Sequence, residues 1–377
     1  MRVLVCGGGT AGHVNPALAI ADIIRQNEPD SVIEYVGTEK GIEATLVRKK
    51  GMILHPIEVQ GLRRSLSPAN LRVLKMAFSA RKECKKIIRA FAPDVVIGTG
   101  GYVCWPVISA AASLHVPTVL HESNAEPGFA VKTLRNVADL ILVNFDGTKK
   151  CLKRSKALVK RVGMPVNPAF ADMSEKHTCK HISDFSDSSD VATRVKKILS
   201  FGGSLGATTL NQAALKLMKE YVSQNPHIQI EHATGSREYE SVKALFQEAG
   251  LDRFDNIKLN EYIYDMPQKM KDADLVICRS GASTLAELGV AKKAAILIPS
   301  PNVTGDQQRK NANELLAQNA AVVLEDSEAV ACIVDVVKKL FEEDMTKLKE
   351  LSDNVGRFAF LDCDQKIFAE IKSLLEG

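Results

Sequence analysis

Short apolar runs alternate with amphipathic stretches along the first 163 residues of the chain. The apolar runs are rich in Val, Ile and Leu and predict strands. The stretches between most of them carry apolar residues three and four positions apart, which predicts helices. Strands are predicted at residues 3–5, 32–37, 53–59, 95–98, 118–121, 140–143 and 158–162. This alternation is typical of a doubly wound, parallel α/β sheet.

The same alternation returns in the second half of the chain. Strands are predicted at residues 198–201, 228–233, 257–259, 275–278, 295–298 and 321–324. Between the halves, residues 172–190 are rich in Ser, Asp and Lys and show little periodicity, which indicates an exposed loop. The predicted domains are therefore 1–163, a linker and loop at 164–195, a second domain at 196–361, and a helix at 362–377 that could pack back on the first domain. Each domain is a Rossmann-like layer, and we expect ligands between them at the strand carboxyl ends.

Two glycine loops, Gly8–Gly12 and Gly202–Gly206, occupy matching positions in the two halves. Each follows an apolar run and precedes an amphipathic helix. Glycines let backbone N–H groups approach a phosphate, and the helix N-terminus adds partial positive charge. One such loop is as often structural as functional, but two in matching positions favour nucleotide binding. Ser204 adds a hydroxyl where a diphosphate would lie.

Polar residues follow several other predicted strands. Glu287 is expected on the first turn of a helix after the glycine turn 279–284, where its carboxylate could accept both ribose hydroxyls of a nucleotide. Thr284 and Glu287 also satisfy a capping box, which requires no ligand, and both interpretations stay open. Gln307 and Gln308 are predicted in a loop, where their amides could bind sugar hydroxyls or simply begin a polar helix.

His13 directly follows the first glycine loop and is a candidate general base near neutral pH. A lone histidine is more often structural, so this alternative also stays open. His121, Glu122 and Asn124 end another predicted strand, and we expect them at the same edge of the sheet.

Composition and charge narrow the functional classes. The eight cysteines are scattered and form no Cys-x-x-Cys, so we expect reduced thiols, no disulfide and no zinc site. The chain begins directly with a predicted strand, which indicates a cytoplasmic protein. Residues 95–114 lack a formal charge, but a glycine turn and Pro106 favour a strand and a buried helix over a membrane span.

The formal net charge of +4 hides an asymmetry, because residues 1–163 hold 24 Lys and Arg against 13 Asp and Glu. The densest part, from Arg63 to Arg89, interleaves basic and apolar residues, which suits an anionic membrane surface. The alternative is a solvated helix whose apolar stripe belongs to the core. Aromatic residues make up only 5% of the chain, which argues against a nucleic-acid surface.

Six motifs, taken together and in order, resemble the MurG family. They are Gly-Gly-Thr-Ala-Gly-His at 8–13, Gly-Thr-Gly-Gly-Tyr-Val at 98–103, His-Glu-Ser-Asn at 121–124, Gly-Gly-Ser-Leu-Gly-Ala at 202–207, Arg-Ser-Gly-Ala-Ser-Thr-Leu-Ala-Glu at 279–287 and Asp-Gln-Gln at 306–308. The resemblance implies a GT-B fold, in which two Rossmann-like domains with parallel sheets face one another across a cleft. It also implies a bacterial, inverting glycosyltransferase of peptidoglycan synthesis.

The resemblance further implies the substrates and their contacts. The donor would be UDP-N-acetylglucosamine, and the acceptor lipid I, undecaprenyl-diphospho-N-acetylmuramoyl-pentapeptide, attacked through its C4 hydroxyl. His13 would be the base, with His121 and Glu122 on the acceptor side and Glu287 on the ribose. Donor contacts would fall on Thr10, Ala11, Gly12, Asn124, Asn167, Ser204, Ile263, Ala282, Ser283, Thr284, Leu285, Ala286, Glu287, Gln307 and Gln308. No cofactor or metal is expected, and the protein would bind the cytoplasmic face of the cell membrane peripherally.

Two positions depart from the family pattern. Ser123 stands where the family usually has Gln, and Asn167 stands where it usually has Arg. The missing arginine would supply positive charge to the donor, a role that could shift to Arg161 or Arg279.

Rival hypotheses are an epimerase of UDP-N-acetylglucosamine, a diacylglycerol glycosyltransferase and a non-catalytic UDP-sugar-binding protein. A dinucleotide-dependent dehydrogenase would use the glycines at 7, 9 and 12 but would leave the second glycine loop and Glu287 unused.

Overall fold

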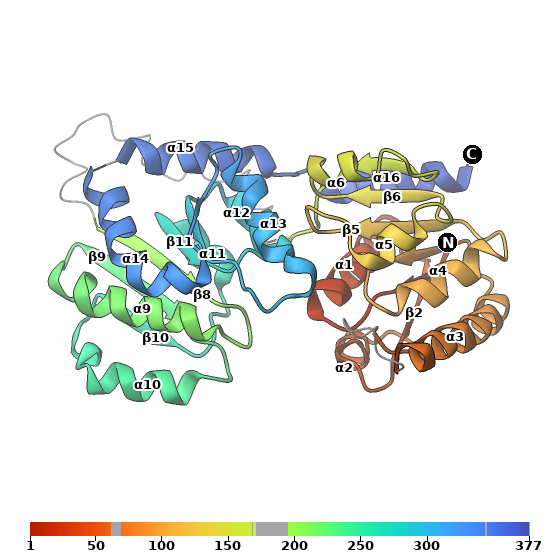
Figure 1. Ribbon diagram of the computed structural model, residues 1–377. Coiled ribbons are helices and arrows are strands. Elements are labelled where there is room, and N and C mark those ends of the chain that lie inside the picture. Colours follow the sequence, from red (N-terminus) through yellow and green to blue (C-terminus); the bar gives the residue numbers. More distant parts are fainter. Residues whose placement is uncertain (62–68, 168, 171–194, 344, 377) are drawn as a thin grey trace. The chain divides into compact units, whose positions relative to one another are not determined.

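The computed structural model describes residues 1–61, 69–167, 169–170, 195–343 and 345–376. The chain divides into two compact units (Figure 1). The first contains Met1–Pro165 together with Phe360–Gly377, and the second contains Val166–Ala359. The first unit is therefore built from both ends of the chain.

The first unit contains a seven-stranded, wholly parallel sheet in the order β3-β2-β1-β4-β5-β6-β7. Its strands are β1 (Arg2–Cys6), β2 (Val32–Gly37), β3 (Leu54–Pro56), β4 (Val95–Gly98), β5 (Thr118–Glu122), β6 (Leu140–Val143) and β7 (Leu158–Arg161). Its helices are α1 (Ala11–Asn27), α2 (Ile42–Lys49), α3 (Ala69–Phe91), α4 (Cys104–Ala112), α5 (Phe129–Leu134), α6 (Asp146–Cys151) and α16 (Cys363–Glu376).

Alternate residues of the inner strands β1, β4, β5 and β6 belong to two different cores, one on each face of the sheet. Val3 and Val5 of β1 pack with α1 and α16 on one face, whereas Leu4 and Cys6 pack with α3 and α4 on the other. Successive side chains of a strand point to opposite faces, so a strand covered on both faces must be apolar throughout. This burial explains the short, continuous apolar runs in the sequence.

The second unit contains a six-stranded parallel sheet in the order β10-β9-β8-β11-β12-β13. Its strands are β8 (Lys196–Phe201), β9 (Ile228–Ala233), β10 (Ile257–Asn260), β11 (Leu275–Cys278), β12 (Ala295–Leu297) and β13 (Val322–Val323). Its α-helices are α9 (Thr208–Glu220), α10 (Tyr239–Glu248), α11 (Met266–Asp272), α12 (Ala282–Ala291), α13 (Gln307–Leu316), α14 (Asp326–Lys338) and α15 (Met345–Val355). Short 3-10 segments lie at Val222–Gln224, Leu251–Arg253, Thr304–Asp306 and Gly356–Phe358, and a π-helical turn at Lys339–Glu343.

Each strand predicted from the sequence is present, although some end earlier than expected. The strand predicted at 53–59 spans only Leu54–Pro56 at the edge of the sheet, and the amide of Ile57 makes one further bond to the oxygen of Gly37 at 2.8 Å. The uncharged segment 95–114 is strand β4 and helix α4, and no helix within the described ranges is long and apolar enough to cross a bilayer. Most of the predicted linker, at 168 and 171–194, lies outside the described residues.

Candidate active site

The first glycine loop joins β1 to α1 and positions His13. Thr10 is the residue before the helix, and Ala11, Gly12 and His13 form its first turn. The Nδ1 atom of His13 lies 3.1 Å from the backbone oxygen of Gly8 and 3.1 Å from Oγ1 of Thr10. A carbonyl only accepts hydrogen bonds, so Nδ1 carries the proton in the neutral ring and Nε2 keeps its lone pair.

The electrostatic setting of His13 favours the neutral imidazole. Burial lowers its pKa below the ordinary 6.5, and the bond to Gly8 only partly opposes this shift. The ring lies against Gly100, where a Cβ atom would come within 2.6 Å of Cδ2 of His13. The glycine turn at 98–101 therefore provides the space that the imidazole occupies.

The two glycine turns of the first unit pack directly on each other. The amide of Gly8 donates to the oxygen of Gly100 at 3.3 Å. Gly101 has a φ of +79°, and a Cβ there would lie 2.0 Å from the oxygen of Gly8. Both the backbone conformation and the close approach require glycine at this position.

His121, at the end of β5, is completely buried. Its Nε2 donates to the backbone oxygen of Gly163 at 3.1 Å, and burial lowers its pKa to about 4. The ring is therefore neutral near pH 7 and is held by the backbone, an arrangement that suits positioning of the strand end better than proton transfer.

Glu122 organises the loop that follows β5. Its Oε1 accepts hydrogen bonds from the backbone and side-chain nitrogens of Asn124, and its Oε2 accepts from the amide of Gly128 at 2.7 Å. Burial raises the pKa of this carboxyl, and the three hydrogen bonds act in the opposite direction. Glu122 thereby fixes the backbone that carries Asn124, whose own side chain is partly exposed.

Glu43, in the first turn of α2, is a buried carboxylate beside the first glycine loop that the sequence reading missed. It accepts hydrogen bonds from the amide of Thr38 at 3.1 Å, from Oγ1 of Thr38 at 2.6 Å and from the amide of Gly9 at 3.3 Å. An acidic residue near a helix start ordinarily faces water, so only the three-dimensional contacts reveal it.

The second glycine loop joins β8 to α9 in the second unit. Gly203, Ser204 and Leu205 are exposed, and the backbone oxygen of Ser204 accepts a hydrogen bond from the amide of Ser236 at 3.1 Å. Gly206 has a φ of +84°, and a Cβ there would lie 2.0 Å from the oxygen of Thr234. The loop thus presents exposed backbone at the carboxyl end of β8, as phosphate binding requires.

Glu287 lies on the second turn of α12, one turn later than expected. The residue before this helix is Gly281, so Thr284 is already inside it and the capping-box interpretation is wrong. Burial raises the pKa of Glu287 to about 7, with no hydrogen bond or ion pair contributing. Of the other predicted contacts on α12, Leu285 and Ala286 are buried, Ser283 is exposed, and Ala282 and Thr284 are partly exposed.

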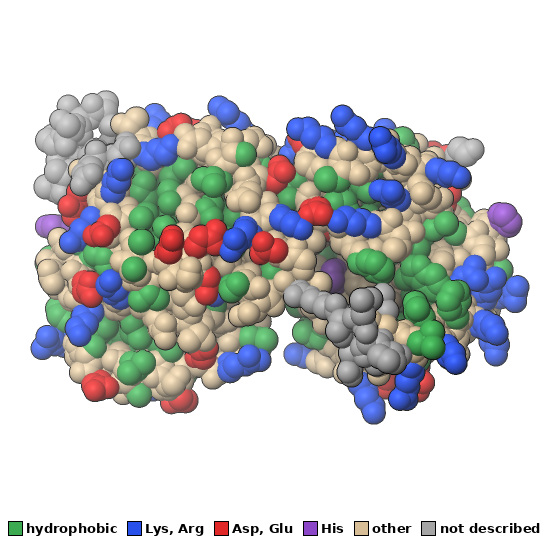
Figure 2. All heavy atoms as spheres, viewed as in Figure 1, with side chains coloured by type: hydrophobic (Ala, Val, Ile, Leu, Met, Phe, Trp, Pro, Cys, Tyr) green, Lys and Arg blue, Asp and Glu red, His purple; other side chains and the backbone are tan. Residues whose placement is uncertain are grey.

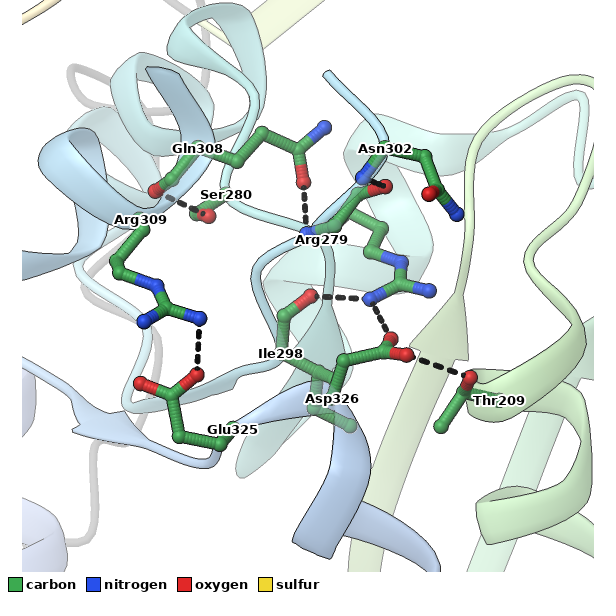
Figure 3. Close-up of polar contacts among 10 residues, drawn as sticks. Thr209, Arg279, Ser280, Ile298, Asn302, Gln308, Arg309, Glu325 and Asp326 are labelled. Atoms are coloured by element: carbon green, nitrogen blue, oxygen red, sulfur yellow. Dashed lines mark hydrogen bonds and ion pairs between the residues drawn. The ribbon is translucent and has the colours of Figure 1, made fainter. Parts of the chain in front are cut away.

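Gln307 and Gln308 begin helix α13 rather than lying in a loop. Gln308 bridges two segments, because its Oε1 accepts from the amide of Ser300 at 2.8 Å. Its backbone oxygen accepts from Oγ of Ser280 at 2.7 Å, as Figure 3 shows. The Oε1 atom of Gln307 is buried and has no hydrogen-bond partner among the described residues. A buried acceptor without a partner is unusual and suits a ligand donor.

The arginines considered as substitutes for Asn167 are both engaged. Arg279 pairs with Asp326 and donates to the oxygen of Ile298 at 2.9 Å (Figure 3). Arg161 forms an ion pair with Asp146, and its guanidinium carbon lies 4.6 Å from the centre of the Phe360 ring. Asn167 itself is exposed, and its Oδ1 accepts a hydrogen bond from the amide of Ala169 at 3.0 Å.

Two further side chains of the second unit, Ile263 and His232, are buried. Ile263, in the loop between β10 and α11, is buried, whereas its sequence neighbours Tyr262 and Tyr264 are exposed. His232 is buried in β9, with its ring nitrogens 3.0 Å from Oγ of Ser200 and 3.0 Å from Oδ1 of Asn211. The sequence reading missed His232, because no local motif distinguishes a histidine bonded across three elements.

Comparison with protein families gives two matches. Residues 3–143 match the glycosyltransferase family 28 N-terminal domain, and residues 197–367 match the glycosyltransferase family 28 C-terminal domain. A curated relative from Acetivibrio thermocellus is 36% identical over 377 residues, covering 100% of this chain and 99% of its own. One from Leuconostoc citreum is 39% identical over 328 residues, covering 87% of this chain and 86% of its own. Both are named UDP-N-acetylglucosamine–N-acetylmuramyl-(pentapeptide) pyrophosphoryl-undecaprenol N-acetylglucosamine transferase.

Solved structures agree with this result. The crystal structure of Acinetobacter baumannii MurG superimposes with a TM-score of 0.77 at 26% identity, covering 99% of each chain. A UDP-GlcNAc 2-epimerase from Neisseria meningitidis, bound to UDP-GlcNAc, has a TM-score of 0.62 at 11% identity, covering 99% of this chain and 100% of its own. At that identity the second likeness shows a shared fold and no more.

Proposed function

The chain belongs to glycosyltransferase family 28 and, within it, to the MurG transferases, and from this membership we infer that His13 is the general base of its reaction. The protein transfers N-acetylglucosamine from UDP-N-acetylglucosamine to the C4 hydroxyl of the lipid-linked N-acetylmuramoyl-pentapeptide, with inversion at the anomeric carbon. The product is lipid II of bacterial peptidoglycan synthesis. The donor is a UDP-sugar and the acceptor is lipid-linked.

The single observation that carries the role of His13 is the bond between its Nδ1 and the oxygen of Gly8. This bond fixes the tautomer that leaves Nε2 as a proton acceptor. The lowered pKa keeps the ring neutral at physiological pH. His13 takes the proton of the C4 hydroxyl while that oxygen attacks the anomeric carbon and the bond to UDP breaks. His121 and Glu122 position the loop that bears Asn124.

On the donor side, the glycine loop 202–206 and the N-terminus of α9 hold the diphosphate and the charge of departing UDP. Because Arg161 and Arg279 are paired with carboxylates, the loop amides and Ser204 take the larger share where the family arginine is absent. Glu287 accepts the ribose hydroxyls. The buried Oε1 of Gln307 accepts a sugar hydroxyl, and Ile263 packs beside the uracil.

We also propose that the first unit binds the anionic membrane surface through α3. Its residues Val73, Ala80, Cys84 and Ile88 are buried, so the core stripe of this helix is accounted for. Leu71, Leu74 and Phe78 are exposed by 62%, 45% and 57% and form a second stripe among Lys and Arg side chains. Figure 2 shows hydrophobic side chains gathered beside basic ones in this part of the unit. Arg63 and Arg64 of the predicted basic segment lie outside the described residues.

The experiment that tests these assignments is the release of UDP from UDP-N-acetylglucosamine, with and without a short-chain prenyl-diphospho-muramoyl-pentapeptide. We expect release only with the acceptor, together with a disaccharide product, and loss of both in His13→Ala. Full turnover in His13→Ala would overturn the assignment of the base. Acceptor-independent release would instead indicate epimerase chemistry.

A further inference from the structure

Glu43 and His13 contact opposite sides of one peptide group. The amide of Gly9 donates to Oε2 of Glu43 at 3.3 Å, and the oxygen of Gly8 accepts from Nδ1 of His13 at 3.1 Å. The Gly8 carbonyl and the Gly9 amide belong to the same planar peptide unit and point in opposite directions. We propose that Glu43 is a positioning residue that orients and polarises His13 through the Gly8–Gly9 peptide.

This arrangement is a carboxylate–peptide–imidazole chain. Hydrogen bonds in a chain polarise one another, so a carboxylate at the N–H end makes the carbonyl at the other end a stronger acceptor. A stronger acceptor at Nδ1 stabilises the imidazolium that forms when Nε2 takes a proton. A directly bound carboxylate has this effect on the histidine of a serine protease triad. Here the peptide stands between the two side chains, and the proton that moves is still the one taken by Nε2.

The packing around Glu43 holds its carboxylate at the peptide. A Cβ at Gly8 would come within 2.9 Å of its Oε1, and a Cβ at Gly41 would come within 2.4 Å of the carboxylate. Thr38 contributes two donors to Oε1, which fixes the rotation of the carboxylate and leaves Oε2 directed at Gly9. All three partners are donors, which suits a group that only accepts. Burying a carboxylate is costly, and this set of donors offsets the cost.

The titratable groups near Glu43 are phenols that stay protonated near pH 7, so they do not neutralise its negative charge. Tyr35 and Tyr102 both approach it, and burial raises the pKa of each phenol. The hydroxyl of Tyr35 donates to the oxygen of Gly7 at 2.7 Å. The His13 ring forms its hydrogen bonds with Gly8 and Thr10 and lies against Gly100, and its backbone oxygen accepts from Thr99; none of these residues is charged. Glu43 is thus the carboxylate whose negative charge acts on the first glycine loop, through the hydrogen bond from Gly9.

The inference rests on His13 being the base, so the test separates the two. We would measure kcat, the KM values for donor and acceptor, and the pH profile in Glu43→Gln, His13→Ala and the double variant. Glu39→Gln is the matched control, because Glu39 is exposed in the segment between β2 and α2 and forms an ion pair with Arg48. Thermal unfolding of each variant reports folding. Glu43→Asp, which keeps the charge on a shorter side chain, replaces Glu43→Gln if the amide variant does not fold.

The expected result for Glu43→Gln is a fall in kcat of about ten- to a hundredfold, by analogy with the loss when the outer partner of a metal-binding histidine is removed. The KM for UDP-N-acetylglucosamine should change less than about twofold. The acidic limb of the pH profile should move to lower pH, because the imidazolium loses stabilisation. In the His13→Ala background the same substitution should have no further effect, since partners in one network are not additive.

An equal fold-loss from Glu43→Gln in the wild-type and His13→Ala backgrounds would overturn the inference and leave Glu43 as a structural residue. An unchanged kcat in Glu43→Gln would also overturn it. Retention of activity in His13→Ala would contradict the assignment of His13 as the base, independently of the results for the Glu43 variants. Glu39→Gln should behave as wild type in every assay.

Discussion

Burial moves the pKa of His13 down and that of Glu287 up, and both shifts have consequences that single substitutions can test. The neutral imidazole is the form that can act as a base. The ionised carboxylate is the form that accepts two ribose hydroxyls. Acid should therefore impair the base in the first unit and donor binding in the second at different pH values.

For His13, we expect His13→Ala and His13→Gln to lower kcat by about 10²–10⁴-fold, the usual contribution of a general base. UDP affinity, measured by calorimetry, should be unchanged, because the donor contacts proposed in the second unit are intact. In the wild type, kcat at saturating donor and acceptor should hold as pH falls to 6.5 and decline only below it, since burial lowers the pKa of the ring. A decline that begins well above pH 7 would contradict this assignment.

For Glu287, we expect wild-type affinity for UDP to fall as pH drops through about 7, where its carboxyl takes up a proton. Glu287→Gln should bind UDP weakly at every pH between 6 and 8.5. The folded-state pKa lies above the ordinary 4.5, so stability is lost as pH rises from about 4.5 to about 7 and the loss levels off above that pH. Glu287→Gln should therefore unfold at a higher temperature than wild type at pH 8.

The matched control for Glu287→Gln is Glu240→Gln, at an exposed position on α10. It should change neither UDP affinity nor the melting temperature. If Glu287→Gln bound UDP as tightly as wild type at pH 8, the ribose contact would have to be assigned to another side chain.

At the scale of elements, α3 is informative because two of its faces are apolar. One stripe is buried in the core, and the other, Leu71, Leu74 and Phe78, is exposed beside basic residues. A helix that served only the core would expose polar residues on its outer face. The core does not require the exposed stripe, which supports the proposed membrane surface on this helix.

We expect Leu71→Ser/Leu74→Ser to lower binding to vesicles rich in anionic phospholipid at least tenfold, measured by sedimentation at low salt. UDP affinity and melting temperature should stay at wild-type values, because neither side chain is buried. Leu245→Ser, at an exposed leucine on α10 in the second unit, is the control and should bind vesicles normally. Loss of vesicle binding in the control, or its retention in the double variant, would count against this surface.

At the scale of the whole molecule, the last helix completes the core of the first unit. Ile367 and Ile371 of α16 are fully buried against the face of the sheet covered by α1. Lys372 forms an ion pair with Glu28 at 2.7 Å, and Glu28 also pairs with the amino group of Met1 at 3.1 Å. The C-terminal helix is thus part of the core of the first unit, which is otherwise built from the first 165 residues.

We expect Ile367→Ala to lower the free energy of unfolding of the first unit by about 2–5 kcal/mol, as large-to-small changes in a core do. Gln365→Ala, at an exposed position of the same helix, should be close to neutral. Denaturant unfolding followed by hydrogen exchange would assign the loss to one unit. A loss confined to residues 166–359 would contradict the packing described.

Much of the candidate site could be predicted from the sequence because it lies at strand ends with local signatures. The glycine loops, His13 and the polar ends of β5 and β11 all follow apolar runs, and parallel sheets bring such ends to one edge. The first residues of the helices were harder to predict from the sequence. The start of α12 at Ala282, which excludes the capping box, and the start of α13 at Gln307 depend on neighbouring loops.

The sequence by itself determined the two parallel sheets, the family and the motifs, because all three depend on local periodicity and on residues close together in the chain. Only the tertiary structure decided which side chains share a hydrogen bond across elements. It placed α16 on the first unit, locked His121 on Gly163 and set Glu43 against the peptide that holds His13. Such contacts join residues that are distant in sequence, and their energies depend on burial and distance, which no local pattern encodes.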